Sequence, residues 1–466
     1  MKLLLTLLAA LTLNAQAPEG LPTGARWIDH LTQDLLPFWD TPSAYGDAPG
    51  AFPGTRCDDT TLYSNTNRCP EIRNNSWISP TQRTLVELSR QTYGYGVAFH
   101  MTGDPRYLKL MKAGVDFIRN NAIDRQNGGI GTTQDIPTGL WSPDPQLRNA
   151  QELGYGLLGL AMYYYLTRDA EVLPDILAIK DYIINNYYNP DLGALQWTLQ
   201  STEKRLVAQL DQMNTYLILL APILPDEAAS DDWKLTAQAL SEIMVGTFYS
   251  PGDHLFFLSA DQPSDTSLAT SGTDFGHNSK ANWMLRWTGL MTGNNDMVAF
   301  AEDNARRIFP RAYIATNGSW AQGLKPGGAL DIDKSWWIYA ELDQFAGTLA
   351  LRDPSFAQYL PSTYDYWLKY FVDPVHGEVW NSVNGTTNAP IRDLPKHWQW
   401  KVAYHSFEHA LVNYIVCQQL HGEPVTLYYA FQQIPSNVRP YYFYADQIQW
   451  NETSAPVQRA EFTGIH

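Results

Sequence analysis

The sequence predicts an all-α fold, a single (α/α)6 toroid with long loops on one face, from three observations. An apolar, helix-like run ends in a short polar break and is followed by a second helical run, six times along the chain. The first run of each pair carries more small and aromatic residues, as a helix buried on all sides would, and the second is more amphipathic. Long connections rich in Gly, Trp, Asp and Asn separate the pairs, which places function on the face that carries them.

The elements follow one another in a simple order. A helix around Ala25 to Asp40 and a loop-rich arm precede the first pair, and residues 18–466 form one catalytic domain. The six polar breaks are "HMTGDPRYL", "LTRDAEVLP", "LPDEAASDDW", "MTGNNDMVAF", "ALRDPSFAQYL" and "LHGEPVTLYYAF". We expect the segment after the sixth pair, "IPSNVRPYYFYADQIQW", to emerge on the loop-bearing face as well.

The first residues, 1–17, have the pattern of a secretory signal peptide. Lys2 precedes a Leu-rich run that is short for a membrane span, and Ala15-Gln16-Ala17 is a small-residue cleavage signal. We therefore expect a secreted, extracellular protein with no membrane partner. An oxidising compartment favours a disulfide between Cys57 and Cys69, whereas Cys417 lies in an apolar helical run and is read as a small buried residue.

The charge and the aromatic content limit the classes of ligand that we expect this protein to bind. The net charge of -16 disfavours nucleic acid as a ligand, and abundant Trp and Tyr favour a neutral glycan. We expect the protein to be a monomer. The sequence lacks HExxH, paired CxxC and Walker signatures, so we expect no metal or other cofactor. N-glycosylation sequons begin at Asn74, Asn317, Asn384 and Asn451.

Several motifs resemble the N-acylglucosamine 2-epimerase and cellobiose 2-epimerase superfamily. They are "LSRQTYGYGVAFHMTGDPRYL", "DQMNTYL", "GHNSKANWML", "KSWWIYAELDQ" and "WKVAYHSFEHAL". The resemblance implies the same barrel. It places at the superfamily's functional positions an arginine, two histidines and a glutamate: Arg90, His277, His405 and Glu341.

Three positions depart from that superfamily. Tyr216 stands for a histidine, Lys280 for a glutamate and Glu408 for an arginine. Epimerisation needs bases that move a proton next to a carbonyl, so the loss of a His and a Glu weakens that interpretation. Lys280 and Glu408 form either an ion pair of reversed polarity or a purely structural pair, and the two histidines are either catalysts or hydrogen-bonded wall residues.

A secreted barrel with an aromatic cleft also suggests a glycoside hydrolase, which needs an acid and a base on the loop-bearing face. Ten carboxylates are candidates there: Asp135, Asp144, Asp261, Asp265, Asp274, Asp331, Asp333, Glu378, Asp393 and Asp446. The segments "DFGHNSKANW" and "RPYYFYADQIQW" resemble the fungal endo-β-1,2-glucanases of glycoside hydrolase family 162.

That closer resemblance implies anomer-inverting cleavage of β-1,2-glucan to sophorooligosaccharides. Asp446 would be the general base, and Gln262 would occupy the position of the general acid, as an isosteric replacement of Glu. The alternative is that Gln262 is natural and the acid lies elsewhere, for example at Asp261.

We expect the glycan to be bound by the residues of the superfamily pattern and by aromatic side chains of the loops. This set comprises Arg90, Trp141, Tyr216, His277, Lys280, Trp320, Trp336, Glu341, His405, Glu408, Tyr441, Tyr442 and Tyr444. Two further hypotheses remain open. One is a sugar epimerase or isomerase, and the other is a glycan-binding toroid that has lost catalysis.

Overall fold

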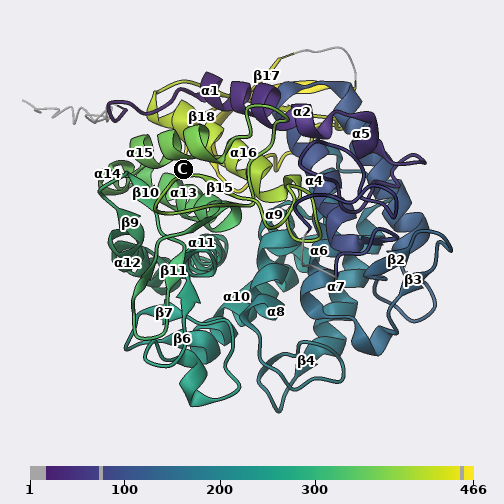
Figure 1. Cartoon of the computed structure of the whole chain (residues 1–466), viewed down its shortest axis with the longest axis horizontal. Helices are drawn as coiled ribbons and strands as arrows, with labels where there is room; N and C mark the ends of the chain where they lie inside the picture. The colour runs from purple at the N-terminus through teal and green to yellow at the C-terminus, as the bar shows by residue number, and fades with distance from the viewer. Residues whose placement is uncertain (1–16, 73–76, 452–455) are drawn as a thin grey trace, which may run out of the picture.

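The computed structural model describes residues 17–72, 77–451 and 456–466, and it confirms the predicted toroid (Figure 1). Inner-ring positions are filled by α4 (Leu85–Thr102), α6 (Ala150–Thr167), α8 (Leu206–Gln212) with α9 (Ile218–Leu220), α11 (Phe275–Thr292), α13 (Trp336–Ala350) and α16 (Ala403–Leu420). The π-helical turn Met213–Leu217 joins α8 to α9, and Ala221–Ile223 follows as a 3-10 turn. Each inner helix packs against the next around the ring.

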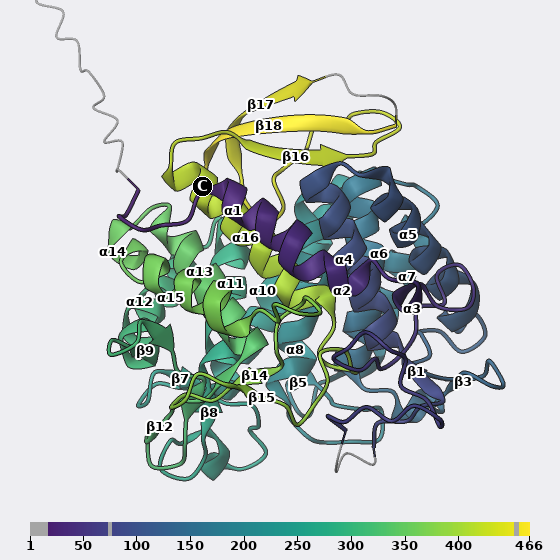
Figure 2. The same cartoon turned by 45° about the horizontal axis from the view of Figure 1, so that its top comes forward.

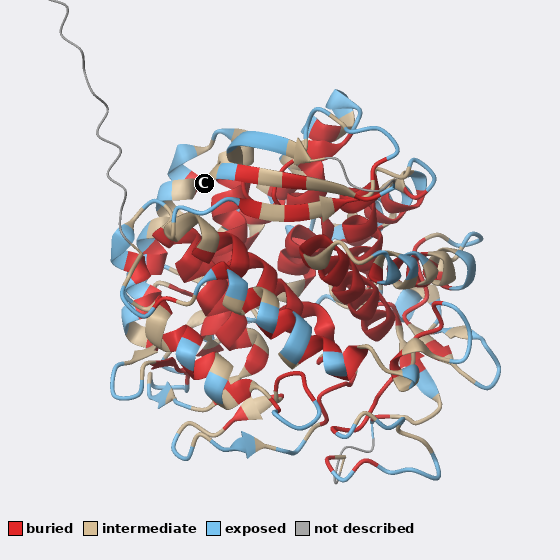
Figure 3. Cartoon of the chain, turned by 90° about the horizontal axis from the view of Figure 1, so that it is seen from above, coloured by how far each residue is buried: buried red, intermediate tan, exposed pale blue. Residues whose placement is uncertain are grey.

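Outer helices run back along the outside of the ring. They are α5 (Pro105–Phe117) with the π-helical turn Ile118–Ala122, α7 (Leu173–Tyr187), α10 (Glu227–Phe248), α12 (Asn295–Ala312), and α14 (Pro354–Ala357) with α15 (Leu360–Tyr366) and the turn Trp367–Phe371. The inner helices are buried almost all round, whereas the outer ones bury one face, and the exposed residues gather at the rim (Figure 3).

The sixth outer position is filled from the N-terminus. α1 (Gly24–Asp29), the π-helical turn His30–Leu35 and α2 (Leu36–Trp39) form one continuous helix, as expected, and α3 (Pro42–Tyr45) follows. This helix packs against α16, where Trp27 Nε1 donates to Cys417 Sγ at 3.2 Å. Cys417 is buried as expected, and burial raises its pKa to about 12.

The prediction of a sixth helical pair is therefore wrong for its second helix. After α16 the chain forms the strand β16 (Val425–Tyr429), which pairs with β18 (Gln458–Ile465), and β18 pairs in turn with β17 (Ala445–Asn451). The pairs are antiparallel.

This C-terminal sheet lies at the end of the barrel opposite the long connections (Figure 2). His100, near the C-terminal end of α4, contacts the Tyr428 carbonyl through Nδ1 at 2.8 Å. The expectation that the final segment emerges on the loop-bearing face is wrong, because the chain leaves α16 at the far end and stays there.

Short antiparallel strands organise the long connections. One sheet joins β1 (Gln82–Thr84), β2 (Thr133–Asp135) and β3 (Trp141–Ser142), a second joins β8 (Thr273–Asp274), β11 (Gly323–Leu324) and β12 (Leu330–Asp331), and a third joins β13 (Lys334–Ser335), β14 (Ser382–Val383) and β15 (Pro390–Ile391). Two-stranded hairpins pair β4 (Tyr188–Asn189) with β5 (Ala194–Leu195), β6 (Tyr249–Ser250) with β7 (Leu255–Phe256), and β9 (Tyr313–Ile314) with β10 (Ser319–Trp320). The 3-10 turns Pro145–Leu147 and Pro263–Thr266 complete these connections.

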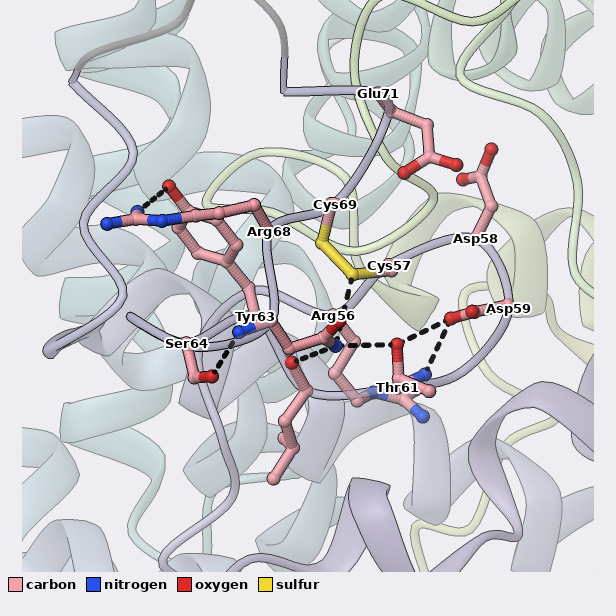
Figure 4. The surroundings of a disulfide bond; sticks show 12 residues. Arg56, Cys57, Asp58, Asp59, Thr61, Tyr63, Ser64, Arg68, Cys69 and Glu71 are labelled. Carbon is pink, nitrogen blue, oxygen red and sulfur yellow. Dashed lines mark hydrogen bonds between the residues drawn. A yellow bond between two sulfur atoms is a disulfide. The ribbon is translucent and has the colours of Figure 1, made fainter.

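The N-terminal arm carries the predicted disulfide, Cys57–Cys69, which is confirmed (Figure 4). Of the sequons, Asn317 is exposed, Asn384 and Asn451 are half-buried, and Asn74 lies outside the described residues. The signal peptide, 1–17, also lies outside them except for its last residue. Among the described residues, no helix is both long and apolar enough to cross a membrane.

Candidate active site

A cavity of about 290 Å³ opens at the end of the barrel where the inner helices begin. All six inner positions contribute to its wall or to the segment that leads into it. The lining residues are Arg90, Gln151, Tyr155, Asp211, His277, Lys280, Trp336, Trp337, Trp398, Trp400 and His405. Those on helices fall within the first two turns, so the positive ends of several helix dipoles converge on this space and favour negative charge in a ligand.

Local sequence explains why the helices begin there. Thr84, Asn149 and Asp274 have extended backbone and accept a hydrogen bond from the amide three residues on, as N-caps do. In α4 the cap is reciprocal, because Glu87 accepts in return from the Thr84 amide at 2.9 Å. The caps fix the start of each helix and so the height at which its first side chains enter the cavity.

Two histidines from α11 and α16 face the cavity. His277 Nδ1 lies 2.7 Å from Asp274 Oδ2, and this contact fixes the ring and leaves Nε2 as its second nitrogen. His405 is buried, and its Nδ1 makes no hydrogen bond. Burial, with further contributions from Lys280 and Arg90, holds the pKa of His405 well below its ordinary value, so its imidazole is neutral at pH 7.

A buried cation lies between carboxylates on the same wall. Lys280 Nζ is 3.1 Å from Glu341 Oε1 and 3.7 Å from Asp211 Oδ1. Burial alone would lower the pKa of Lys280, but Glu341, Tyr155 and Asp211 outweigh it and raise that pKa above its ordinary value. Burial raises the pKa of Glu341 to about 7, partly offset by Lys280. Lys280 is therefore a fixed positive charge.

Arg90 supplies the second cation. Its guanidinium stacks 4.0 Å from the centre of the Tyr155 ring and donates to the Trp400 carbonyl. Its Nε is buried without a hydrogen-bond partner. An arginine held by an aromatic ring keeps its planar edge available for oxygen atoms of a ligand.

The C-terminal segment closes the barrel beneath the cavity. Tyr441 reaches in from the far end and donates to Glu408 Oε1 at 2.6 Å, and its hydroxyl lies 2.8 Å from that of Tyr93. Tyr442 donates to the Asn214 carbonyl at 2.7 Å. Within the described residues, these contacts close the barrel at the end opposite the cavity mouth.

Three buried groups in this region form a donor set that could hold a cation. They are Glu341, His405 and Glu408, whose ligand atoms all lie within 4.8 Å of one another. Lys280 already places a positive charge 3.1 Å from Glu341, so this chain supplies its own counter-ion there.

The structure brings together most of the residues expected from the superfamily pattern. Arg90, His277, Lys280, Trp336 and His405 line the cavity. Glu341 and Glu408 lie directly behind them, through the ion pair with Lys280 and the bond to Tyr441. Their role in binding a substrate stays a prediction.

Other expected contact residues lie elsewhere. Tyr216 is fully buried against Trp233 of the outer helix α10, and Trp320 is buried with its Nε1 bonded to Asp343, so both are core residues and the prediction that they bind glycan is wrong. Trp141 lies on β3 and does not line the cavity.

The predicted contacts of the C-terminal tyrosines also need correction. Tyr441 and Tyr442 are buried as the plug under the cavity, and Tyr444 stacks on His466 at the far end. A glycan that enters from the loop face would meet other side chains first, so contact with these three tyrosines is not supported.

The predicted acid and base are not brought together. Gln262 is an exposed residue of the β7–β8 connection and begins the 3-10 turn that follows, whereas Asp446 lies on β17 with its side chain exposed near His466. The β7–β8 connection lies at the loop-bearing end of the barrel and β17 lies at the opposite end (Figure 2), and the inner helices between these two ends are about 27 Å long where they have 18 residues, as α16 does. Gln262 and Asp446 cannot flank one glycosidic bond, so this pairing is wrong.

Sequence reasoning missed several lining residues. They are Gln151, Tyr155, Asp211, Trp337, Trp398 and Trp400. Two had a usable signal, because Trp398 and Trp400 alternate in "HWQWK" immediately before the helix that carries His405. Asp211 and Trp337 had a signal as well, because they lie in the motifs "DQMNTYL" and "KSWWIYAELDQ" that carry the resemblance to the superfamily.

Comparison with known proteins agrees with this fold. No family model matches the chain. A cellobiose 2-epimerase of Ruminococcus albus is 22% identical over 398 residues, which cover 81% of this chain and 94% of that protein. The structure of cellobiose 2-epimerase from Bacillus thermoamylovorans B4167 superposes with a TM-score of 0.70 at 18% identity, over 84% of this chain and 98% of the other.

This chain has the barrel of sugar epimerases. A GH76 α-mannanase from Bacteroides thetaiotaomicron has a more distant version of the same fold, with a TM-score of 0.54 at 11% identity over 74% of this chain and 92% of that one. The likeness to the epimerases thus supports the barrel expected from the sequence motifs. It gives no specific support to the endo-β-1,2-glucanase resemblance.

Proposed function

We propose that this protein is a sugar 2-epimerase or aldose–ketose isomerase that moves a proton at the reducing end of a neutral saccharide. The observation that carries the proposal is that His277 and His405, from helices separated by α13, face one cavity. The sequence relatives named as cellobiose 2-epimerases support it.

The chemistry requires a base, an acid and a stabilised oxyanion. One neutral histidine takes the proton from C2 of the open-chain sugar, and the electrons of that C–H bond form an enediolate with the carbonyl. The other histidine, in its protonated form, returns a proton to the opposite face of C2 for epimerisation, or to C1 for isomerisation while a second proton moves from O2 to O1. The first histidine then passes its proton to solvent, and the second takes one up. Lys280 and Arg90 stabilise the negative oxygen of the intermediate, helped by the helix N-termini.

The departures from the superfamily pattern do not remove this equipment. Tyr216 replaces a histidine at a position that faces the outer ring, and the two remaining histidines still supply a base and an acid. Lys280 places a cation where the superfamily has a carboxylate, and this positive charge stabilises the negative oxygen of an enediolate. Because His405 is neutral at pH 7, it can accept a proton from the sugar without first losing one.

Incubation with cellobiose, mannose and glucose in D2O tests the proposal. We expect an epimer or a ketose isomer of the sugar that carries deuterium at the exchanged carbon, detected by proton NMR. His277→Ala and His405→Ala should each lower the rate by about 10²-fold or more, whereas His376→Ala, at an exposed loop histidine, should not. No exchange with any of the three sugars would overturn the proposal.

Hydrolysis of β-1,2-glucan is a second candidate, favoured by one observation. Burial raises the pKa of Glu341 to about 7, so Glu341 can carry a proton at neutral pH, and Asp211 lies on the same wall beside Lys280. These two, rather than Gln262 and Asp446, would then be the acid and base. Shortening of linear β-1,2-glucan without exchange of free sugars would support this candidate.

Location and assembly belong to the same proposal. We infer export, from the signal-peptide pattern, and action as a monomer on a neutral glycan in an oxidising compartment. The disulfide Cys57–Cys69 supports such a compartment. Mass spectrometry of the protein expressed in a secreting host would test cleavage near Ala17 and the state of the sequons.

A further inference from the structure

An exposed tryptophan of the N-terminal arm continues the aromatic wall of the cavity outward. Trp398 lines the cavity, and its ring centre lies 5.2 Å from that of Trp77 in an edge-on arrangement. Trp398 is 9% exposed, whereas Trp77 is 53% exposed. An indole left half in solvent beside a binding cavity is unexplained by core packing.

The wall that holds Trp398 is rigid. The Trp398 indole donates to Asn381 Oδ1 at 3.0 Å, and its backbone amide donates to the Lys401 carbonyl at 2.9 Å. Its ring plane is therefore set independently of Trp77. A ligand leaving the cavity along Trp398 would meet an aromatic surface of fixed orientation.

Residues of the N-terminal arm that precede Trp77 are bonded to the same wall. Arg56 in the arm donates through Nε to His397 Nδ1 at 3.1 Å, and the Lys396 amide donates to Asp58 Oδ1 at 2.9 Å. The disulfide closes the loop that contains Asp58 (Figure 4). The arm is thus bonded to the two residues that directly precede Trp398.

The volume of the cavity limits how many sugar rings of a ligand it can hold, and the remaining rings must lie outside it. At about 290 Å³ it is at the lower limit of small-molecule sites, so it holds little more than one sugar ring. When the reducing-end ring lies between the two histidines, the next ring of a longer saccharide must lie at the mouth. The apolar C–H face of a pyranose packs on an aromatic ring, and Trp77 presents one there.

We propose that Trp77 forms, with Trp398, an outer subsite for the second ring of a neutral disaccharide or longer oligosaccharide. This inference rests on the proposed function only for placing the first ring in the cavity. It makes the protein selective for oligosaccharides over free monosaccharides. Because the arm supplies the contact, selectivity and catalysis reside in different segments of the chain.

Binding of glycosides that lack a reducing end tests the subsite without turnover. Titration calorimetry would compare methyl β-glucoside with methyl β-cellobioside and methyl β-sophoroside, in the wild type, Trp77→Ala and Trp77→Phe. Tyr188→Ala is the matched control, because Tyr188 is a 46% exposed aromatic residue on another hairpin. Thermal melts of all variants check that the fold is intact.

We expect the wild type to bind at least one disaccharide glycoside more tightly than the monosaccharide glycoside. Trp77→Ala should weaken that disaccharide roughly three- to tenfold and leave the monosaccharide unchanged, with Trp77→Phe in between and Tyr188→Ala like the wild type. Absence of a disaccharide advantage in the wild type, or its persistence in Trp77→Ala, would overturn the subsite. A disaccharide advantage without proton exchange would keep the subsite and refute only the epimerase proposal.

Discussion

The hydroxyl of Tyr441 donates to Oε1 of Glu408 at 2.6 Å, although the two residues reach this point from opposite directions. Glu408 projects from α16, while Tyr441 arrives from the C-terminal segment with a left-handed backbone (φ 57°), a conformation costly for a residue other than glycine. The contact joins the plug to the carboxylates behind the cavity. Burial raises the pKa of Glu408, and the Tyr441 hydroxyl partly offsets this rise.

Tyr441→Phe removes that donor while preserving the ring. A buried acceptor left without its partner costs about 1–3 kcal/mol, so we expect a lower melting temperature together with a change in the pH dependence of turnover. Tyr444→Phe, at the outer end of the same segment, is the control and should change neither. An unaltered melting temperature in Tyr441→Phe would show that this hydrogen bond does not contribute to stability.

Lys280→Met should be far more harmful than loss of a surface lysine. Removal of this cation leaves Glu341 and Asp211 buried without their counter-charge, and breaking a buried pair costs about 3–5 kcal/mol. Lys112→Met breaks an exposed pair with Asp116 and should cost under about 1 kcal/mol. Urea unfolding of both variants measures the difference, and equal costs would argue against a desolvated Lys280.

Stability should fall as the pH rises from about 4.5 to 7 because of Glu341. Its pKa in the folded protein, about 7, exceeds its ordinary value, so the folded state binds more protons than the unfolded state across this window. Glu341→Gln cannot ionise and should show a shallower fall of melting temperature between pH 5 and pH 7.5, by a few degrees. Parallel pH curves for variant and wild type would place the pKa of Glu341 near its ordinary value.

Cys57→Ser with Cys69→Ser should loosen the arm. Opening a loop of this length costs roughly 3 kcal/mol, and the arm then holds Trp77 less firmly against Trp398. We expect faster proteolysis within the arm and weaker disaccharide binding, with cleavage sites mapped by mass spectrometry. Digestion at the wild-type rate would show that bonds such as Arg56 to His397 hold the arm unaided.

Gln262→Glu and Asp446→Asn should each leave activity on free sugars within about twofold of the wild type. Neither side chain lines the cavity, and surface changes of this kind rarely exceed about 0.5 kcal/mol. Rates of proton exchange and of β-1,2-glucan cleavage would both be measured. Glucan cleavage gained by Gln262→Glu would reinstate that residue as the acid of a hydrolase.

The barrel could be predicted because its signal is local and repeated. Each pair of helical runs carries its own periodicity and polar break. The sixth pair failed since "PVTLYYAF" also reads as a strand, and β16 alternates buried Val425, Leu427 and Tyr429 with half-buried Thr426 and Tyr428. This alternation, which is typical of a strand, was present in the sequence, but we expected a helix because five helical pairs preceded the segment.

The site was predictable only in part. His277 and His405 followed from motifs that resemble a superfamily, and each lies close to its helix start. The plug did not follow, because no pattern within residues 434–450 states which end of the barrel they enter. Contacts such as Tyr442 to Asn214, more than two hundred positions apart, are decided by the assembled fold.

Closure of the ring by the helix of residues 24–39 has a consequence for synthesis on the ribosome. Among the helices of the described residues, this helix is made first and its partner α16 is made last, and Trp27 meets Cys417 across 390 positions. During translation its apolar face has no lasting place to dock, and such non-local closure is slow. Nascent chains that stop before residue 403 should therefore engage chaperones, and the ring can become complete only after α16 has left the ribosome.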